Sequence, residues 1–388
     1  MSTPKESLKQ PSADQVTVAI PAFNCAAYLK ETLHAVARLN QKPAHVLVID
    51  DGSTDSTGSV ASSAGVTVVK HEINKGLGAA RQTALDNCRT PWLAMVDGDV
   101  LVESDWLAQL LFAAKEHQLS GVGGDLLESN ARTVADRWRA RMMAQTHGGE
   151  LKLDVNLFGC NTLHSTAALR TVGGFNPRYT KAHEDIDVSE RLKKAGFKLG
   201  YTPLAKCVHA RRDTLTSVLK AAFSWRLPRY EEQGCYDNSK ALMNKWVQTF
   251  REDLRELNML TEEGNGELSF PCLVQLFTNP VMDLEVVAVR SESMKLRGLA
   301  GIGTAMVLLV LKRALISEEL KQRVGLALKP FIESVTKTLE RVALPHEDNP
   351  ELQRLVTATI DPWTTVLALS PENTAKLLAS ANQTLNEG

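Results

Sequence analysis

The sequence predicts an α/β fold: a Rossmann-like, mixed sheet flanked by helices, followed by an additional α-helical domain. Two observations carry this prediction. From Val16 onward, short β-rich runs alternate with amphipathic helical stretches, the pattern of βαβ units around a mostly parallel sheet. After about Asp213, strand signals nearly vanish and helical periodicity continues to the end of the chain.

The first hundred residues form a regular alternation. Strands are expected at residues 16–20, 45–49, 66–70 and 92–96, and helices between them at residues 26–39, 54–64 and 77–88. In open sheets of this kind, ligands bind at the carboxyl ends of the strands. The residues that follow each strand are therefore the first candidates for a site.

Beyond Ser104 the pattern becomes mixed. Helices are expected at 106–115, 132–143 and 185–195, strands near 122 and at 157–163, and an extended segment at 197–209. In the later helical region, breaks are expected at Pro228, Pro271, Pro280, Pro330 and Pro345.

The composition suggests three parts: a polar leader at residues 1–15, an α/β domain at 16–237 and a helical domain of unknown role at 238–388. The leader lacks the apolar run of a signal peptide. A second apolar run, residues 298–311, would be about 21 Å long as a helix, shorter than the roughly 30 Å hydrocarbon core of a membrane. We interpret it as a buried helix, and contact with a membrane surface stays open.

Charge and cysteine content exclude several classes of protein. The 388 residues carry a net charge of −1, so the chain lacks the overall positive charge that attracts nucleic acid. The six cysteines form no C-x-x-C pair, which argues against a zinc ribbon or a disulfide framework. We expect a cytoplasmic protein, and a position at the inner face of the membrane stays open.

Asp97-Gly98-Asp99 follows an apolar strand and is the first candidate for chemistry. Two carboxylates at a sheet edge can hold Mg²⁺ or Mn²⁺, which in turn binds phosphate oxygens. The simpler interpretation is a turn, because Asp-Gly-Asp is good turn chemistry. Two further polar loops favour a ligand site over a simple turn. Residues 50–55 follow another strand and can cap the next helix. The glycine-containing loop 74–81 could approach an anionic ligand closely.

Residues 16–212 resemble family-2 glycosyltransferases, the inverting nucleotide-sugar enzymes of the GT-A fold. Seven motifs occur in the order of that family: AIPAFN (19–24), VIDDGSTD (48–55), NKGLGAAR (74–81), MVDGD (95–99), VGGF (172–175), HEDIDVSERLKKAGF (183–197) and VHARR (208–212).

The resemblance implies roles by position. The residues implied to bind the nucleotide sugar, given as UDP- or GDP-sugar, are Pro21, Phe23, Asn24, Asp51, Asn74, Gly76, Arg81, Asp97, Asn161 and Arg211. Asp99 and His209 are implied to bind the metal, Mn²⁺ or Mg²⁺. A strand-end structural histidine is the alternative for His209.

Glu184 and Asp185 precede an amphipathic helix, where free amides and the helix dipole stabilise anions. By sequence alone they are helix-cap acids. The resemblance implies that Asp185 is the general base, which removes a proton from an acceptor hydroxyl, while Glu184 positions or assists. Cys160 is expected to be a small packing residue.

The processive synthases of the family carry Q-x-x-R-W after the base, and residues 223–226 (FSWR) have no such pattern. We therefore expect non-processive transfer to a glycan, lipid or small-molecule acceptor; a homo-oligomer stays open. A retaining transferase on the same fold and a catalytically silent binding or scaffold protein are the alternatives. A nucleotidyltransferase would need a G-x-G-T-R-like loop, where this chain has PAFN.

Overall fold

The computed structural model describes residues 11–128, 131–290 and 317–341. The chain forms two compact units: one comprises residues 1–130 and 144–211, the other residues 131–143 and 212–388. These units separate at residues 211 and 212, whereas the sequence predicted a domain boundary at residues 237 and 238. The domain boundary stays a prediction. The apolar run 298–311 lies outside the described residues.

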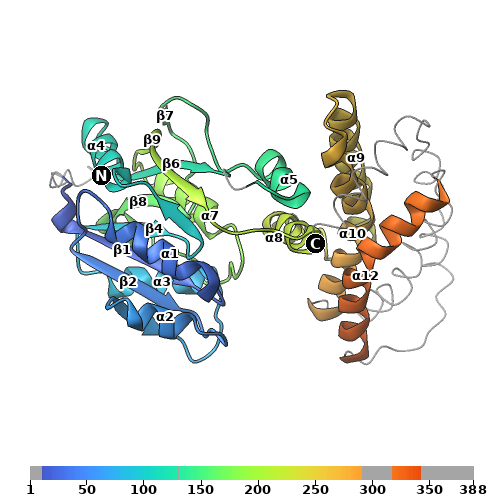
Figure 1. The fold of residues 1–388 in the computed structure, drawn as a ribbon, viewed down its shortest axis with the longest axis horizontal. Helices are drawn as coiled ribbons and strands as arrows, with labels where there is room; N and C mark the ends of the chain where they lie inside the picture. Colours follow the sequence, from blue (N-terminus) through green and yellow to red (C-terminus); the bar gives the residue numbers. More distant parts are fainter. Residues whose placement is uncertain (1–10, 129–130, 291–316, 342–388) are drawn as a thin grey trace. The chain divides into compact units, whose positions relative to one another are not determined.

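The first unit is built on a mixed sheet, as predicted (Figure 1). Its strands are β1 (Val16–Ala22), β2 (His45–Asp50), β3 (Thr67–Lys70), β4 (Trp92–Val96), β5 (Val100–Val102), β6 (Gly121–Leu127), β7 (Lys152–Leu153), β8 (Asn161–Ser165) and β9 (Leu199–His209).

The strand order is β3-β2-β1-β4-β8-β6-β9-β5, with β7 paired to β9. The first four of these strands are parallel, and β8 is antiparallel to both β4 and β6. The carboxyl ends of β1, β2 and β4 therefore lie at one edge of the sheet. The short strands β5 and β7 were not predicted, because two or three residues carry too little periodicity.

Helices cover both faces of this sheet. Buried side chains of α1 (Ala26–Ala37), α2 (Thr57–Ser63) and α4 (Trp106–Glu116) share one hydrophobic cluster with the sheet. Those of α3 (Leu77–Asn87), α6 (Thr166–Thr171) and α7 (Glu184–Lys194) share a second. Residues 13–15 of the predicted leader form a short 3₁₀ turn, η1 (Ala13–Gln15).

Pairing of β5 with β9 joins two segments that are far apart in the sequence. Val100 lies opposite His209, and the amide of Ala210 donates to the carbonyl oxygen of Asp99 at 2.8 Å. The turn between β4 and β5 and the end of β9 are thus held side by side.

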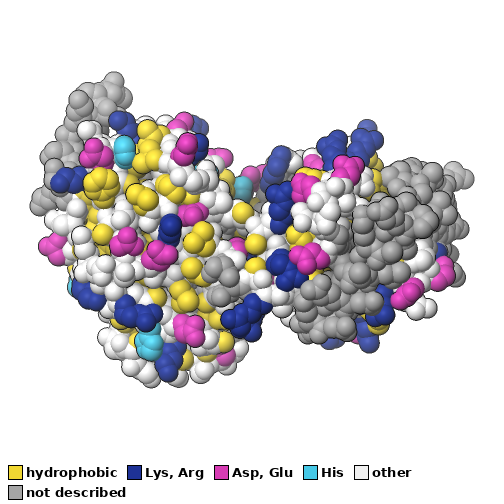
Figure 2. Space-filling model, turned by 45° about the horizontal axis from the view of Figure 1, so that its top comes forward, with side chains coloured by type: hydrophobic (Ala, Val, Ile, Leu, Met, Phe, Trp, Pro, Cys, Tyr) yellow, Lys and Arg dark blue, Asp and Glu magenta, His cyan; other side chains and the backbone are white. Residues whose placement is uncertain are grey.

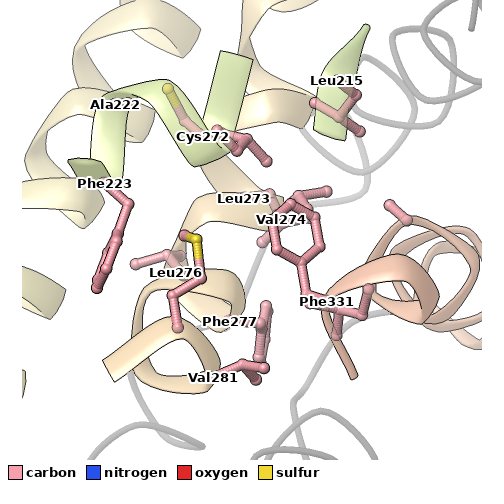
Figure 3. Close-up of a cluster of buried hydrophobic side chains, with 14 of the residues drawn as sticks. Leu215, Ala222, Phe223, Cys272, Leu273, Val274, Leu276, Phe277, Val281 and Phe331 are labelled. Atoms are coloured by element: carbon pink, nitrogen blue, oxygen red, sulfur yellow. The ribbon is translucent and has the colours of Figure 1, made fainter. Parts of the chain in front are cut away.

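The second unit is helical, as predicted, in its described residues. It contains α5 (Val134–Met142), α8 (Leu215–Glu232), α9 (Ser239–Glu262), α10 (Gly266–Arg290) and α12 (Glu318–Arg341). Its core is apolar, and Figure 3 shows side chains of α8, α10 and α12 meeting there, among them Phe223, Phe277 and Phe331. The predicted helix α5 groups with this unit, although its sequence interrupts the first one.

The predicted breaks at four prolines are wrong. Pro228 lies inside α8, Pro271 and Pro280 inside α10, and Pro330 inside α12. Each proline removes one backbone donor, but burial of the helix around it offsets that loss. Pro345 lies outside the described residues.

Helix α10 is apolar and mostly buried. Residues 267–290 are long and apolar enough to cross a membrane, and 83% of their most apolar window is buried inside the unit. The core helix of a soluble protein passes the same test.

A polar seam runs between α9 and α10. The ammonium group of Lys245 donates to Asp283 at 2.6 Å, and both side chains are fully buried. Farther along, Gln275 and Asn279 donate to the buried carboxylate of Asp253. The α9 partners, Lys245 and Asp253, are eight residues apart, and the α10 partners recur every four residues. The seam therefore specifies one antiparallel register of the pair.

Candidate functional site

Several predicted site residues lie at the carboxyl ends of β1, β2 and β4, and others come from α3, α7 and the end of β9. Arg81 of α3 is their centre. Its guanidinium group forms one ion pair with Glu184, at the start of α7, and a second with Asp97, at 2.9 Å. Arg81 and Glu184 are 2% and 1% exposed. Three motifs that lie up to 103 residues apart are therefore joined by one buried cation.

Gly159 makes room for this cation. A Cβ atom at Gly159 would lie 1.8 Å from a terminal nitrogen of Arg81, so no larger residue fits without moving the guanidinium group. The amide of Gly159 also donates to the carboxylate of Asp185 at 2.9 Å. The other carboxylate oxygen of Asp185 accepts from the amide of Ile186 at 2.8 Å.

A second group of charges surrounds Asp99. Nε2 of His209 lies 3.7 Å from one carboxylate oxygen of Asp99, and a terminal nitrogen of Arg211 lies 3.7 Å from the other. Nδ1 of His209 contacts the carboxylate of Glu128 at 2.8 Å. Glu128 thereby orients the imidazole with Nε2 toward Asp99.

This donor set suits a hard divalent cation. Carboxylate oxygen and imidazole nitrogen are ligands that Mn²⁺ accepts, and a carboxylate behind the histidine is the usual support for such a ligand. Within the described ranges, no group of three or more His, Cys, Asp and Glu side chains is arranged to hold a metal ion. Asp99 and His209 could thus supply part of a coordination sphere that needs further oxygen ligands.

Burial and charge shift several pKa values here. Burial raises the pKa of Glu184 to about 8, although Arg81 opposes the shift. Desolvation likewise raises the pKa of Asp97, with Arg81 opposing it and Asp99 adding to it. Burial by itself lowers the pKa of His209, but Asp99 and Glu128 outweigh it and raise the value to about 9. A cation bound at Asp99 would oppose the protonation of His209.

Asp51 anchors the loop before α3. Its carboxylate accepts from the amides of Lys75 and Gly76, at 2.9 and 2.8 Å, and contacts Nδ1 of His71 at 2.6 Å. Asn74 donates to the backbone oxygen of Asp51. Asp51 is 3% exposed. Its carboxylate therefore fixes the position of the loop at Lys75 and Gly76.

The glycines of this loop serve close packing inside the chain. Gly76 has φ +91°, and a Cβ atom there would lie 2.6 Å from Thr180. The amides of Leu77 and Gly78 donate to the carbonyl oxygens of Thr180 and Tyr179. The first amides of α3 are thus engaged by residues 179 and 180, and the approach of this loop to an anionic ligand stays a prediction.

Asn24 links the ends of β1 and β2. Its side-chain oxygen accepts from the backbone amide of Thr54 at 2.9 Å, and its backbone amide donates to the hydroxyl of Ser53. Pro21 is buried within β1, whereas Phe23 is 47% exposed beside this link. Phe23 thus presents an aromatic ring to solvent at the edge where a base would lie.

Asn161 has a packing role. It is 1% exposed; its oxygen accepts from the indole of Trp106, and its nitrogen donates to the carbonyl oxygens of Asp125 and Ala205. These contacts engage the amide within the sheet, and contact of Asn161 with the nucleotide sugar stays a prediction. Burial raises the pKa of the Cys160 thiol well above its usual range, in agreement with its expected packing role.

Sequence reasoning missed two residues of the site. Glu128 follows β6, outside every motif, and only its contact with His209 identifies it. Gly159 was noted only as part of a pocket-shaping segment, and its use emerges from the position of Arg81. An acid directly after a predicted strand could have flagged Glu128 as a candidate.

Comparison with known families identifies the family of one part of the chain. The sequence profile described as "Glycosyl transferase family 2" matches residues 17–173. This part of the chain belongs to glycosyl transferase family 2. The family 2 match includes the loops with Asp51, Arg81 and Asp99, and it ends before Asp185 and His209.

Curated relatives are consistent with this membership. The chain is 30% identical over 227 residues to the pre-mycofactocin glycosyltransferase of Mycobacterium tuberculosis, which covers 53% of this chain and 44% of that protein. It is 29% identical over 180 residues to the PGL/p-HBAD biosynthesis glycosyltransferase of Mycobacterium bovis, covering 43% and 66%. The chain thus spans less than half of the first of these relatives.

Among solved structures, S. aureus TarS 1-349 covers 84% of this chain and 90% of its own length, with 16% identity and a TM-score of 0.44. The mannosyltransferase PcManGT of Pyrobaculum calidifontis, solved with GDP-Man and Mn2+, covers 87% and 91%, with 15% identity and a TM-score of 0.43. The family 2 assignment does not depend on these likenesses.

Proposed function

We propose that the chain transfers a sugar from a nucleotide-diphosphate donor to an acceptor hydroxyl, with a divalent metal, inversion at the anomeric carbon and no processivity. One observation carries the proposal: Arg81 binds both Asp97 of the metal-phosphate turn and Glu184 of the base segment. This contact ties the proposed donor end of the site to the proposed acceptor end.

In this proposal Asp99 and His209 would hold Mn²⁺ or Mg²⁺, and the bound metal would supply positive charge to balance the leaving nucleoside diphosphate. Arg211, near Asp99, adds a cation beside the diphosphate. Phe23 and the loop anchored by Asp51 form the wall for the base and ribose.

Asp185 removes the proton from the acceptor hydroxyl as its oxygen attacks the anomeric carbon opposite the leaving group. The amides of Gly159 and Ile186 fix the orientation of its carboxylate. Glu184 holds Arg81 and so serves as a positioning residue. The absence of the Q-x-x-R-W pattern supports non-processive transfer, and Arg226 of the corresponding segment is bound to Asp253 in the helical unit.

A thermal-shift screen of UDP- and GDP-sugars with Mn²⁺ or Mg²⁺ tests the donor site. A matching donor at one hundred times its Kd adds about 2.7 kcal/mol to the unfolding free energy. The Asp99→Asn variant should lose the metal-dependent part of this stabilisation. If no nucleotide sugar stabilises the wild type with either metal, the proposal fails and the scaffold alternative replaces it.

The anomeric configuration of the product tests the inverting step. A β-linked product from an α-linked donor supports direct displacement with Asp185 as base. An α-linked product would favour the retaining alternative and remove that role from Asp185. The Asp185→Asn variant should keep donor binding and lose transfer.

We further propose that the helical unit binds the acceptor or a partner. Deleting all residues after 237 would test this poorly, since α5 and α8 would lose their packing partners α9 and α10. Substitution of exposed residues of α9, such as Val247 and Met259, is the gentler test.

On the face shown in Figure 2, charges of both signs are interspersed rather than gathered in one field. Location at the cytoplasmic side of a membrane remains part of this proposal.

A further inference from the structure

The two neighbours of Gly159 extend the site beyond the proposed base. The amide of Gly159 holds the carboxylate of Asp185, and Gly159 lies between Phe158 and Cys160 in the chain. Consecutive Cα atoms are only about 3.8 Å apart. A side chain that contacts Phe158 or Cys160 therefore lies in the neighbourhood of the proposed base.

Two side chains of one loop make these contacts. The imidazole of His147 stacks on the ring of Phe158, with centroids 4.9 Å apart and planes inclined by 22°. The thiol of Cys160 donates to the side-chain oxygen of Gln145 at 3.8 Å. Burial raises the pKa of this thiol well above its usual range, so the thiol keeps the proton that it donates.

The loop that carries both side chains, residues 145–148, is fixed by Tyr201 of β9. The hydroxyl of Tyr201 donates to the carbonyl oxygen of Gly148 at 2.8 Å and lies 3.0 Å from the hydroxyl of Thr146. The ring of Tyr201 meets the imidazole of His147 edge to face, with centroids 5.2 Å apart. Tyr201 is 1% exposed, so water does not compete for these contacts. A loop held in this way loses less entropy when a ligand binds to it.

The hydrogen bond of His147 decides which of its ring nitrogens is open. Nε2 lies 2.7 Å from the backbone carbonyl oxygen of Asn156, which can only accept, so Nε2 carries a proton and donates it. In the neutral ring Nδ1 then holds a lone pair. Nδ1 makes no hydrogen bond in the part of the chain that the structure describes, and it is not shut off from water. His147 therefore offers one hydrogen-bond acceptor.

Gln145 offers the complementary groups. Its side-chain oxygen accepts from Cys160, which leaves the amide nitrogen with two N–H donors. Among residues 11–128, 131–290 and 317–341 this nitrogen has no hydrogen-bond partner, and it too is open to water. Donors and an acceptor are thus presented two residues apart on one fixed loop.

This combination suits hydroxyl groups better than ions. A hydroxyl group both donates and accepts, so one hydroxyl can donate to Nδ1 of His147 while its neighbour accepts from the amide of Gln145. A phosphate or carboxylate has no proton for Nδ1, and the nearby carboxylate of Asp185 would repel it. A simple alcohol has only one hydroxyl for the two side chains. The loop therefore matches a molecule with neighbouring hydroxyl groups.

We propose that Gln145 and His147 bind neighbouring hydroxyl groups of a neutral sugar in the acceptor, so that a further hydroxyl of the same sugar reaches Asp185. This inference rests on the proposed function, since it names the class of acceptor for that reaction. The subsite takes the sugar that reacts, whereas the proposal for the helical unit concerns the rest of the acceptor or a partner.

A saturation-transfer NMR titration of the full chain tests this subsite without any donor. The probes are the methyl glycosides of glucose, galactose and mannose. Glycerol 3-phosphate is the anionic control, and hexanol is the control with a single hydroxyl. We expect at least one methyl glycoside to bind, and neither control to bind.

Two variants remove the proposed contacts and keep the loop. His147→Gln retains an N–H donor for Asn156 but lacks the acceptor at Nδ1, and Gln145→Met retains the side-chain length but lacks the amide. Each should weaken methyl glycoside binding by about threefold to tenfold, the loss of one hydrogen bond between neutral groups. The unfolding midpoint and the stabilisation by the donor should not change. The matched controls His45→Gln and Gln41→Met, at exposed positions of the same unit, should bind as the wild type does.

A competition experiment separates the acceptor from the donor. The Asp185→Asn variant, in which transfer should be lost, is saturated with the matching nucleotide sugar and Mn²⁺ and titrated again. Binding of the methyl glycoside should persist, because donor and acceptor occupy different places. Displacement by the nucleotide sugar would assign Gln145 and His147 to the donor sugar and overturn the inference.

The inference is also overturned if no methyl glycoside binds, or if both single variants bind it unchanged. Binding of glycerol 3-phosphate that His147→Gln weakens would replace the neutral sugar by an anion. Failure of the proposed function is distinguishable, because it appears as a lack of donor stabilisation in the thermal-shift screen, whereas the glycoside titration contains no donor.

Discussion

Replacing Arg81 by glutamine removes the cation that joins the two ends of the site. Arg81 is buried against two carboxylates, of which Glu184 is 1% exposed and the Asp97 side chain is 29% exposed. Arg81→Gln keeps much of the side-chain length and the polarity, but leaves both acids without their cation. The cost should therefore come mainly from the acid that water cannot reach.

The magnitude follows from this difference in exposure. Breaking a buried ion pair by removing one partner costs about 3–5 kcal/mol, because the remaining charge is buried and uncompensated. A part-exposed pair such as Arg81–Asp97 adds at most about 1 kcal/mol. We expect the unfolding free energy of Arg81→Gln to fall by roughly 3–6 kcal/mol.

Urea unfolding at pH 9, above the pKa of about 8 that burial gives Glu184, followed by tryptophan fluorescence, measures the loss. Glu184→Gln should cost less than Arg81→Gln, because Arg81 keeps Asp97 as its partner. The double variant should cost clearly less than the sum of the two, since the neutral glutamine at 184 no longer needs a cation. Arg89→Gln, an exposed site in the same unit, should stay within about 0.5 kcal/mol of the wild type.

The reasoning is refuted if Arg81→Gln lies within 1 kcal/mol of the wild type, or if the two single losses simply add. Either result would mean that Glu184 is not held by Arg81 in solution. Donor stabilisation in the thermal-shift screen should also decline in Arg81→Gln, since Asp97 loses its orienting partner.

Three other outcomes are expected. Adding EDTA, or replacing Asp99 by asparagine, should abolish the Mn²⁺-dependent stabilisation by the matching nucleotide sugar; a shift that survives both would remove Asp99 from the metal site. Because burial raises the pKa of Glu184 from 4.5 to about 8, the folded chain holds a proton in that interval that the unfolded chain has released. Unfolding free energy in metal-free buffer should therefore fall as pH rises from 4.5 to 8, by on the order of 1.4 kcal/mol per unit from this group, and Glu184→Gln should flatten the urea-derived profile. In the helical unit, Lys245→Met leaves Asp283 buried without its cation and should cost about 3–5 kcal/mol by urea unfolding, whereas the Lys245→Met/Asp283→Leu double variant should recover much of that loss.

The sequence predicted the fold of the first unit well because its signals are local. Short β-rich runs identified β1, β2, β3 and β4 to within two residues at either end. It failed where elements are very short, at β5 and β7, and where packing overrides a local rule, as at Pro280 within α10.

The candidate site divides in the same way. Asp97 and Asp99 were identified as candidates because ligands bind at the carboxyl ends of strands in such sheets, and Arg81 because it lies in one of the family motifs. The motifs could not distinguish a ligand-facing residue from one whose contacts lie within the chain. Asn161 and Gly76 stay predicted contacts of the nucleotide sugar, and the structure adds contacts within the sheet and with the loop that ends at Thr180.

The sequence by itself determined the order of strands and helices, the family motifs and the positions at which acids follow strands, because these depend on residues close together in the chain. Only the tertiary structure decided the partners: β5 brings Val100 to His209, Arg81 reaches Glu184 across 103 residues, and Gly159 leaves space for that ion pair. Such contacts depend on which surfaces are buried together and which charges lose water in the process, and no local pattern contains that information.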